Sequence, residues 1–200
     1  MATMTLIRGA DLVAAPWKNG GGVTREVAAF PLHAGLDIFT WRVSIADVAQ
    51  AGPFSRFTGI DRTLVLLSGA GMLLDETDDT HAHAVKTHAL TQPLDIAQFA
   101  GEARIDARLV DGATRDFNLM VRRGAAVDET EVWRGATQRT LSADVVLLFC
   151  ASGSVQVALG GDAQPHALDT DDTLRIDAPN ALSCVVEGTG ALLAISIRYM

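Results

Sequence analysis

The stretch from Pro16 to Glu26 carries residues whose types and spacing suit anion binding. Lys18 and Asn19 precede three consecutive glycines, at positions 20–22, and Arg25 follows them. A glycine run favours positive φ angles or close approach of a ligand to the backbone, and successive unshielded N–H groups can form a concave anion nest. The lysine precedes the glycines and no Ser or Thr follows it, so the segment is not a P-loop. A small carboxylate fits this chemistry, and a flexible turn leading into an edge strand would explain the same residues.

Two further polar side chains are expected on inward rows of strands. Arg62 opens a predicted strand in phase with Leu64, which places its guanidinium on the core-facing side. A charge there is costly unless it is paired. A ligand carboxylate would pair it, and so would an internal acid such as Glu26 or Asp116. Asn118 is disfavoured on a strand, which suits either a polar residue that lines the interior or an amide that ties down a neighbouring loop.

Two histidines with one residue between them, His81 and His83, present a pattern that can bind a metal. They follow an acidic stretch that is typical of a hairpin tip. A cupin metal site would add a glutamate three or four residues after the second histidine, where Lys86 and Thr87 stand. We therefore expect a solvated loop, with no metal and no cofactor.

Strands must position all of these groups, because period-2 patterns dominate the chain and helical stripes are nearly absent. The only helical turns expected are residues 46–51 and the start of the chain. Cys150 and Cys184 lie in apolar strand-like runs and are expected to be buried free thiols. The sequence predicts an all-β fold. The predicted strands are residues 23–30, 39–45, 62–67, 71–75, 94–99, 103–110, 115–122, 145–150, 154–159, 172–176, 181–186 and 191–199.

The two halves of the chain resemble each other, which indicates a duplicated β unit. Residues 64–67 resemble 145–148, residues 88–90 resemble 166–168, and the offset falls slowly along the chain. Two small antiparallel barrels or sandwiches are expected, over residues 1–123 and 124–200. The candidate site residues lie in the first half. We expect the site there and a structural or assembly role for the second half.

Composition excludes several classes of function. The chain has 200 residues, of which 48% are hydrophobic, and a formal net charge of −8. That charge disfavours a nonspecific nucleic-acid binder. The longest unbroken apolar run, residues 145–151, is far shorter than the roughly 20 residues of a membrane helix. No signal-peptide pattern precedes Arg8 and Asp11, so a cytoplasmic location is expected, without nucleic-acid or membrane partners.

Several motifs together resemble the HutD/Ves family over about residues 6–123. They are Pro16 to Glu26, Trp41-Arg42-Val43-Ser44, Gly52-Pro53-Phe54-Ser55, Gly59-Ile60-Asp61-Arg62 and Asp116-Phe117-Asn118-Leu119-Met120. Thr58 departs from the proline that is common in the family, which affects only the rigidity of that turn.

The resemblance implies a bicupin of two packed antiparallel β-barrels (double-stranded β-helix units) without the metal-binding histidines of cupin enzymes. Family members are associated with bacterial histidine utilisation and are thought to bind a small carboxylate such as formylglutamate or urocanate, as a governor of the pathway. No catalytic activity is established for them. The implied ligand-binding positions are Lys18, Asn19, Gly20, Gly21, Gly22, Arg25, Glu26, Arg42, Arg62 and Asn118.

Our first hypothesis is therefore carboxylate binding without turnover, in which Arg62 and Lys18 clamp the carboxylate and Asn118 and Glu26 bind a polar end. A second hypothesis is a cupin-type isomerase or hydrolase that acts on a small acid, with Glu26 as general base or with His81 and His83 around a metal. A third is an interaction module whose second half presents a self-association surface, as in a homodimer.

Overall fold

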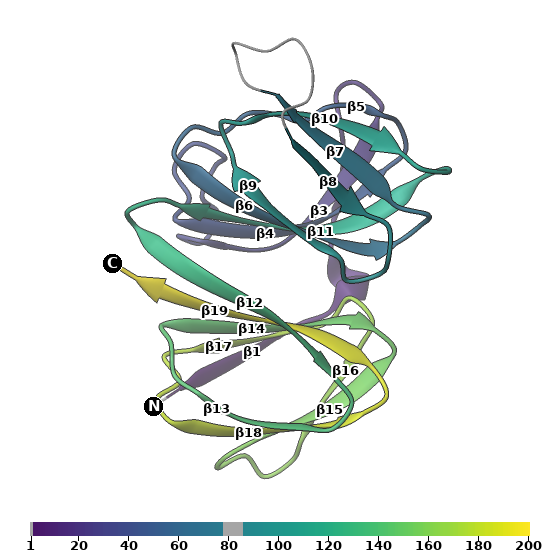
Figure 1. Cartoon of the computed structure of the whole chain (residues 1–200). Helices are drawn as coiled ribbons and strands as arrows, with labels where there is room; N and C mark the ends of the chain where they lie inside the picture. Colours follow the sequence, from purple (N-terminus) through teal and green to yellow (C-terminus); the bar gives the residue numbers. More distant parts are fainter. Residues whose placement is uncertain (1, 78–85) are drawn as a thin grey trace. The chain divides into compact units, whose positions relative to one another are not determined.

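The computed structural model describes residues 2–77 and 86–200, which form strands and one 3-10 turn (Figure 1). His81 and His83 lie outside the described residues. The all-β prediction is confirmed, and no described helix is long and apolar enough to cross a membrane. The elements are β1 (Thr3–Ile7), η1 (Gly9–Asp11), β2 (Ala14–Pro16), β3 (Gly22–Phe30), β4 (Trp41–Val48), β5 (Gly52–Pro53), β6 (Ile60–Ser68), β7 (Met72–Thr77), β8 (Lys86–Leu90), β9 (Ile96–Ala100), β10 (Arg104–Leu109), β11 (Thr114–Arg122), β12 (Ala126–Arg134), β13 (Thr137–Leu141), β14 (Val145–Ser152), β15 (Ser154–Leu159), β16 (His166–Asp169), β17 (Thr173–Asp177), β18 (Leu182–Gly188) and β19 (Ala191–Tyr199).

The chain divides into two units, and the first is continuous in sequence. This N-terminal unit comprises Val13–Ala125. It contains a six-stranded sheet, in the order β2-β3-β4-β11-β6-β9, and a four-stranded sheet, in the order β5-β10-β7-β8. Its apolar interior joins the two sheets, since Leu64 and Leu66 of the larger sheet pack with Met72 and Leu74 of the smaller. Alternation along each strand thus directs one row of side chains inward, as expected for an antiparallel fold.

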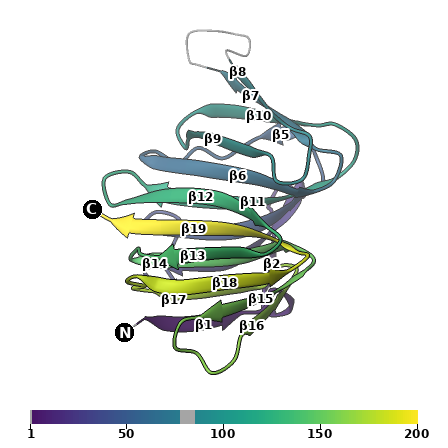
Figure 2. The same cartoon turned by 60° about the horizontal axis from the view of Figure 1, so that its bottom comes forward.

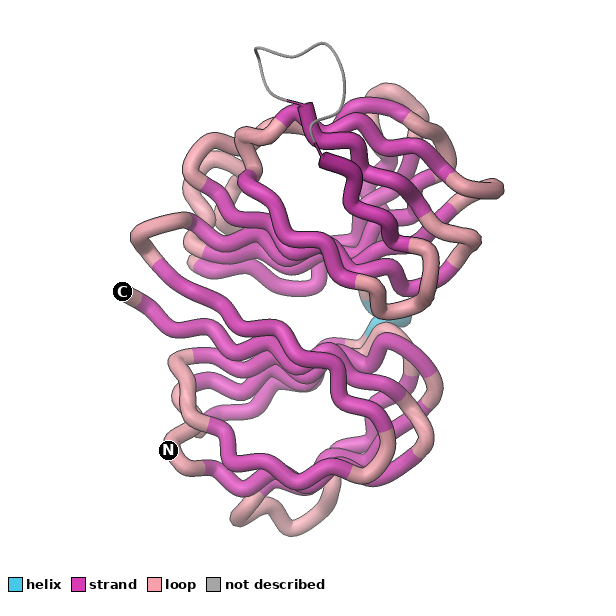
Figure 3. The backbone as a smooth tube through the Cα atoms, in the orientation of Figure 1, coloured by secondary structure: helices cyan, strands magenta, loops and turns pink. Residues whose placement is uncertain are grey.

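The C-terminal unit combines two separate pieces of chain, the residues up to Leu12 and Ala126–Met200. Its five-stranded sheet has the order β1-β17-β14-β19-β12, and its four-stranded sheet has the order β13-β18-β15-β16. Figure 2 brings β18 and β15 of the smaller sheet forward. All four sheets in the described chain have free edge strands, so each unit encloses its interior between open sheets (Figure 3).

The N-terminal strand differs from the sequence-based division at residues 123 and 124. β1 pairs with β17 over its whole length, from Thr3 opposite Asp177 to Ile7 opposite Thr173. It therefore completes a sheet of the C-terminal unit, while the residues after Leu12 begin the other unit. The sequence contains no local signal for this pairing, because the two strands are far apart in the chain.

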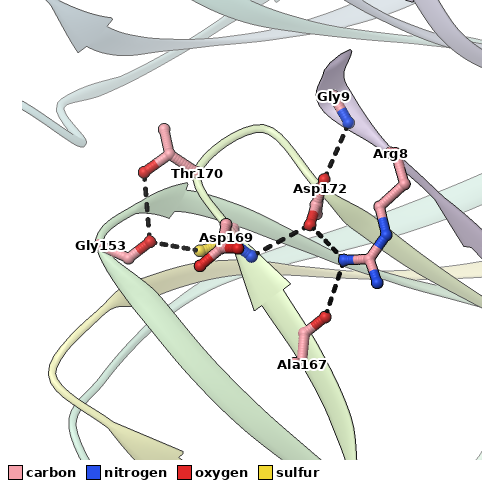
Figure 4. A network of polar contacts seen from close by, with 8 residues as sticks. Arg8, Gly9, Gly153, Ala167, Asp169, Thr170 and Asp172 are labelled. Atoms are coloured by element: carbon pink, nitrogen blue, oxygen red, sulfur yellow. Dashed lines mark hydrogen bonds and ion pairs between the residues drawn. The ribbon is translucent and has the colours of Figure 1, made fainter. Parts of the chain in front are cut away.

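The carboxylate of Asp172 holds this N-terminal segment in place (Figure 4). It accepts hydrogen bonds from the Arg8 guanidinium at 2.7 Å, from the Gly9 amide at 2.9 Å and from the Asp169 amide at 3.1 Å. Burial opposes ionisation of Asp172, but these hydrogen bonds outweigh it and hold the pKa of the carboxyl below its ordinary value. A charged, hydrogen-bonded carboxylate thus joins the N-terminal segment to the β16–β17 turn.

Other sequence predictions meet mixed outcomes. The helical turn expected over residues 46–51 is wrong, because β4 continues to Val48 and residues 49–51 are not helical. Seven strands were not predicted, among them β12 and β13. The two cysteines are buried and free, as predicted, and burial raises the pKa of each thiol to about 11.

Candidate functional site

The inward face of the six-stranded sheet gathers polar side chains on neighbouring rows. Residues paired across antiparallel strands project to the same face. Ser44 pairs with Glu26 on one side and with Asn118 on the other. In the next row Met120 lies between Arg42 and Arg62. The register thus brings two cations, one carboxylate, one hydroxyl and one amide together on this face.

Arg62 is the more deeply buried of the two arginines, with 7% of its surface exposed. Its Nε and Nη2 groups donate to Asn118 Oδ1 at 3.3 and 3.1 Å. Phe54, Phe57 and Phe99 surround it, with ring centroids 5.2, 5.9 and 5.2 Å from the guanidinium carbon. Such cation–π contacts offset part of the cost of burying the charge. Within the described residues, Arg62 has no ion pair with a carboxylate.

Asp116 lies one row from Asn118 on β11 and is 2% exposed. Burial raises the pKa of its carboxyl to about 7, although the charge of Arg62 acts in the opposite direction. Burial likewise lowers the pKa of Arg62 to about 10, opposed by the charge of Asp116. The Oδ2 atom of Asp116 is buried without a hydrogen-bond partner. This interior therefore holds a buried cation and a buried acid that do not form a close ion pair.

Arg42 and Glu26 lie nearer to solvent. The Nε of Arg42 donates to Glu26 Oε2 at 2.7 Å, and its Nη1 donates to the Ser44 hydroxyl at 3.3 Å. The Arg42 side chain is 13% exposed and that of Glu26 is 44% exposed. The polar side chains thus form a row that runs from the half-exposed Glu26 to the buried Arg62.

The three-glycine segment forms a turn whose amides are partly used inside the turn itself. The Gly20 amide donates to the Trp17 carbonyl at 3.0 Å, and the Gly21 amide donates to Asn19 Oδ1 at 3.0 Å. Gly20 has a φ of 71°, which favours glycine. A Cβ at Gly22 would lie 2.5 Å from the Asp47 carbonyl oxygen. Turn geometry therefore accounts for Gly20, and close packing accounts for Gly22.

Beside this turn is a cavity of about 40 Å³, between Trp17, Asn19 and Gly21 on one side and Gln50 to Phe54 on the other. It has room for only one or a few water molecules. The exposed Lys18 has no interaction with another described residue.

Arg25 lies on the other face of the sheet. It is opposite Ile45, which projects away from the row of Arg42 and Ser44. Its guanidinium forms an ion pair with Asp47, which Arg115 also approaches at 3.4 Å. Arg25 and Arg62 therefore lie on opposite faces of the sheet, because successive residues of a strand project to alternate faces.

The HutD family model matches residues 9–194. This chain belongs to the HutD/Ves family. A relative from Pseudomonas putida, called an uncharacterized 21.2 kDa protein in the hutC 3' region, is 35% identical over 99% of this chain and 100% of its own length. Protein Ves from Escherichia fergusonii is 33% identical over 92% of this chain and 88% of its own.

Solved structures agree with the family and with the fold. HutD from Pseudomonas fluorescens SBW25, in a structure described as a formate condition, has a TM-score of 0.82 and 31% identity, and covers 99% of this chain and 100% of its own. A conserved protein of unknown function from Pseudomonas aeruginosa PAO1 has a TM-score of 0.84 and 29% identity, with the same coverage. An oxalate decarboxylase with a TM-score of 0.65 and 9% identity, covering 100% of this chain and 79% of its own, supports the cupin-like fold alone.

The HutD/Ves chain thus gathers four of the ten predicted site residues, Glu26, Arg42, Arg62 and Asn118, on one inward face. Lys18, Asn19 and glycines 20–22 belong to the separate turn. Sequence reasoning did not place Ser44, Asp116 or the three phenylalanines in the site. The strand period could have found Ser44 and Asp116, because they alternate in phase with Arg42 and Asn118. The phenylalanines come from loops and from β9, and no local pattern connects them.

In the described ranges, 2–77 and 86–200, no group of three or more His, Cys, Asp or Glu side chains could hold a metal ion. His81 and His83, the pair that the metal hypothesis invoked, fall outside those ranges.

Proposed function

We propose that this HutD/Ves protein binds a small carboxylate metabolite inside its N-terminal unit, with Arg62 as the anchor. The observation that carries the proposal is the buried guanidinium with no carboxylate partner in the described chain. A buried charge is costly without a counterion, and arginine stays protonated at neutral pH. A ligand carboxylate would supply the missing charge through a bidentate contact.

The neighbouring groups favour a ligand with a second polar end. The Oδ1 of Asn118 accepts from Arg62, which leaves the Asn118 amide N–H groups to donate to the same carboxylate. The half-exposed Glu26 and the buried Ser44 both contact Arg42. They would bind an amide or an imidazole.

This chemistry fits formylglutamate or urocanate, and the P. putida relative's name places that protein beside hutC. We therefore propose that the chain binds such an intermediate and acts as a governor of histidine utilisation.

Isothermal titration calorimetry with N-formyl-L-glutamate, urocanate and L-histidine tests this proposal. We expect saturable binding of at least one carboxylate by the wild type and at least a tenfold weaker affinity in Arg62→Gln. Arg108→Gln is the matched control, because Arg108 forms an exposed ion pair with Asp75 and lies away from this face. NMR of the same mixtures should show the ligand unchanged after incubation.

The absence of heat with all three compounds would contradict the proposal. So would an unchanged affinity in Arg62→Gln, because a ligand that does not use the buried guanidinium is bound elsewhere.

A further inference from the structure

The C-terminal unit contains a cavity of about 230 Å³, the larger of the two cavities described here. Its lining residues come from β12 and β19 of the five-stranded sheet and from β13 of the four-stranded sheet and the residue that follows it. Its volume is below the roughly 300–1,000 Å³ of sites for drug-sized ligands, so a small metabolite is the fitting class.

Four charged side chains line this cavity, and they do not pair with one another. Glu129 and Glu131 come from β12, Arg139 from β13 and Arg198 from β19. In the described chain, no ion pair joins either glutamate to either arginine. Two positive and two negative side chains, all four of them exposed to solvent, therefore line one small space.

Neutral groups contact three of these four side chains. The Trp133 indole N–H donates to Glu131 Oε2 at 2.6 Å, and the Arg139 guanidinium lies over the Trp133 ring, 5.6 Å from its centroid. The Arg198 Nη2 donates to the Ser142 carbonyl at 3.2 Å. Trp133 is 7% exposed, so the group that orients both an acid and a base is itself fixed in the core. A buried aromatic residue thus contacts one exposed side chain of each charge.

The cavity occupies the same topological place as the polar row of the N-terminal unit. β19 lies between β12 and β14, as β11 lies between β4 and β6. Ser196 pairs with Glu129 and Val146, as Asn118 pairs with Ser44 and Leu64. Both units therefore have polar residues on the central strand and on the strand beside it, β4 in one unit and β12 in the other.

We propose that this cavity is a second ligand site, for a small zwitterion of the α-amino acid class. The glutamates on β12 bind the ammonium group and the two arginines bind the carboxylate. A ligand with both charges satisfies both pairs at once, whereas a simple acid or a simple amine satisfies one pair and meets like charge at the other.

Two-dimensional ¹H–¹⁵N NMR provides a local readout, because the Trp133 indole N–H contacts Glu131 directly. The protein has three tryptophans, and Trp133→Phe identifies the resonance. Titration with L-histidine and with L-glutamate should shift it saturably, with a Kd below about 1 mM for at least one of them. Acetate and methylamine should each bind at least tenfold more weakly than that amino acid.

Substitutions test whether the shift of the Trp133 resonance depends on the charged side chains that line the cavity. Glu131→Gln keeps an oxygen for the indole hydrogen bond and removes the charge, so we expect at least a tenfold increase in Kd. Arg198→Ala should have a similar effect from the other side of the cavity. Glu187→Gln, at an exposed position near the end of β18, is the matched control and should bind like the wild type. Arg62→Gln should also leave this titration unchanged, which separates this site from the proposed carboxylate site.

No saturable shift with either amino acid would overturn the proposal, provided that the folded spectrum is retained. Equal affinities for acetate and for the amino acids would overturn it as well, because the ammonium would then contribute nothing. An unchanged Kd in both Glu131→Gln and Arg198→Ala would place binding elsewhere.

Discussion

The interiors of the two units differ in the charge that they accept. The N-terminal unit buries Arg62 and Asp116 between its sheets. The C-terminal unit places Ala194 at the position on β19 that corresponds to Asp116, and its interior cluster is apolar around Leu148. Since the strand order is alike, the fold does not require the charges. The N-terminal unit therefore keeps two buried charged residues that its fold does not need and that cost stability. Residues of this kind are expected at functional sites.

The largest effect should follow from disturbing the apolar interior. Leu148→Ala removes a fully buried side chain, so we expect the free energy of unfolding to fall by about 3–5 kcal/mol. Denaturant unfolding followed by circular dichroism measures this loss, and carboxylate affinity in the folded protein should not change. Leu66→Ala is the matched variant in the other unit and should cost a similar amount. A loss below about 1 kcal/mol at Leu148 would contradict the assignment of this residue to a packed core.

The next largest loss of stability should follow from removing the Asp172 carboxylate, which accepts hydrogen bonds from Arg8 and Gly9. Asp172→Ala leaves these donors without their acceptor, and we expect a loss of about 2–3 kcal/mol. The stabilisation requires the ionised form, whose pKa lies below its ordinary value in the folded protein, so it should disappear as the pH falls through that lowered pKa. Asp111→Ala, in an exposed turn, is the control and should change stability little. Equal stabilities of Asp172→Ala and the wild type at neutral pH would contradict this role.

The buried acid of the N-terminal unit should show the opposite pH dependence. From the ordinary aspartate pKa of 3.8 up to about 7, folded Asp116 keeps a proton that the unfolded chain has released. Stability should therefore fall as the pH rises through this window, by about 1 kcal/mol per pH unit. Asp116→Asn should remove that slope between pH 5 and 7, and Asp111→Asn should retain it. Parallel wild-type and Asp116→Asn curves of unfolding free energy against pH would show that the raised pKa is wrong.

The smallest effect on stability should come from replacing the buried Arg62 of the N-terminal unit by an apolar residue. Arg62→Met replaces a buried guanidinium by an apolar chain, so we expect the free energy of unfolding to rise by about 1 kcal/mol while carboxylate binding is lost. Thermal unfolding and calorimetry on the same sample measure both quantities. A large loss of stability instead would mean that the contacts with Asn118 and the phenylalanines outweigh the cost of burial.

Strand periodicity is what made parts of this architecture and site predictable. The alternation of Arg62 with Leu64 placed the guanidinium inward, and the structure agrees. The same rule, applied to Arg25 and Glu26, would have put these neighbours on opposite faces, yet both were assigned to one site. The pattern does not predict β12, because the row that ends in the buried Trp133 also holds the exposed Glu129 and Glu131, whose charges lower β propensity.

Long-range pairing could not be predicted from local patterns. β1 is a short strand whose partner lies near the other end of the chain, and only the folded register reveals the pair. The glycine run illustrates the reverse case. Its backbone requirement was real, but the turn and the Asp47 carbonyl explain it, and sequence alone does not distinguish these causes from an anion nest.

The split composition of the C-terminal unit has a consequence for biosynthesis. β1 leaves the ribosome well before β17, which begins more than 160 residues later. At roughly 5–20 residues per second, the nascent segment waits on the order of ten seconds for its partner, during which the continuous N-terminal unit can complete its own fold. β1 thus docks long after it is made, and a chain that stalls before β17 leaves β1 as an unpaired strand that is available for aggregation.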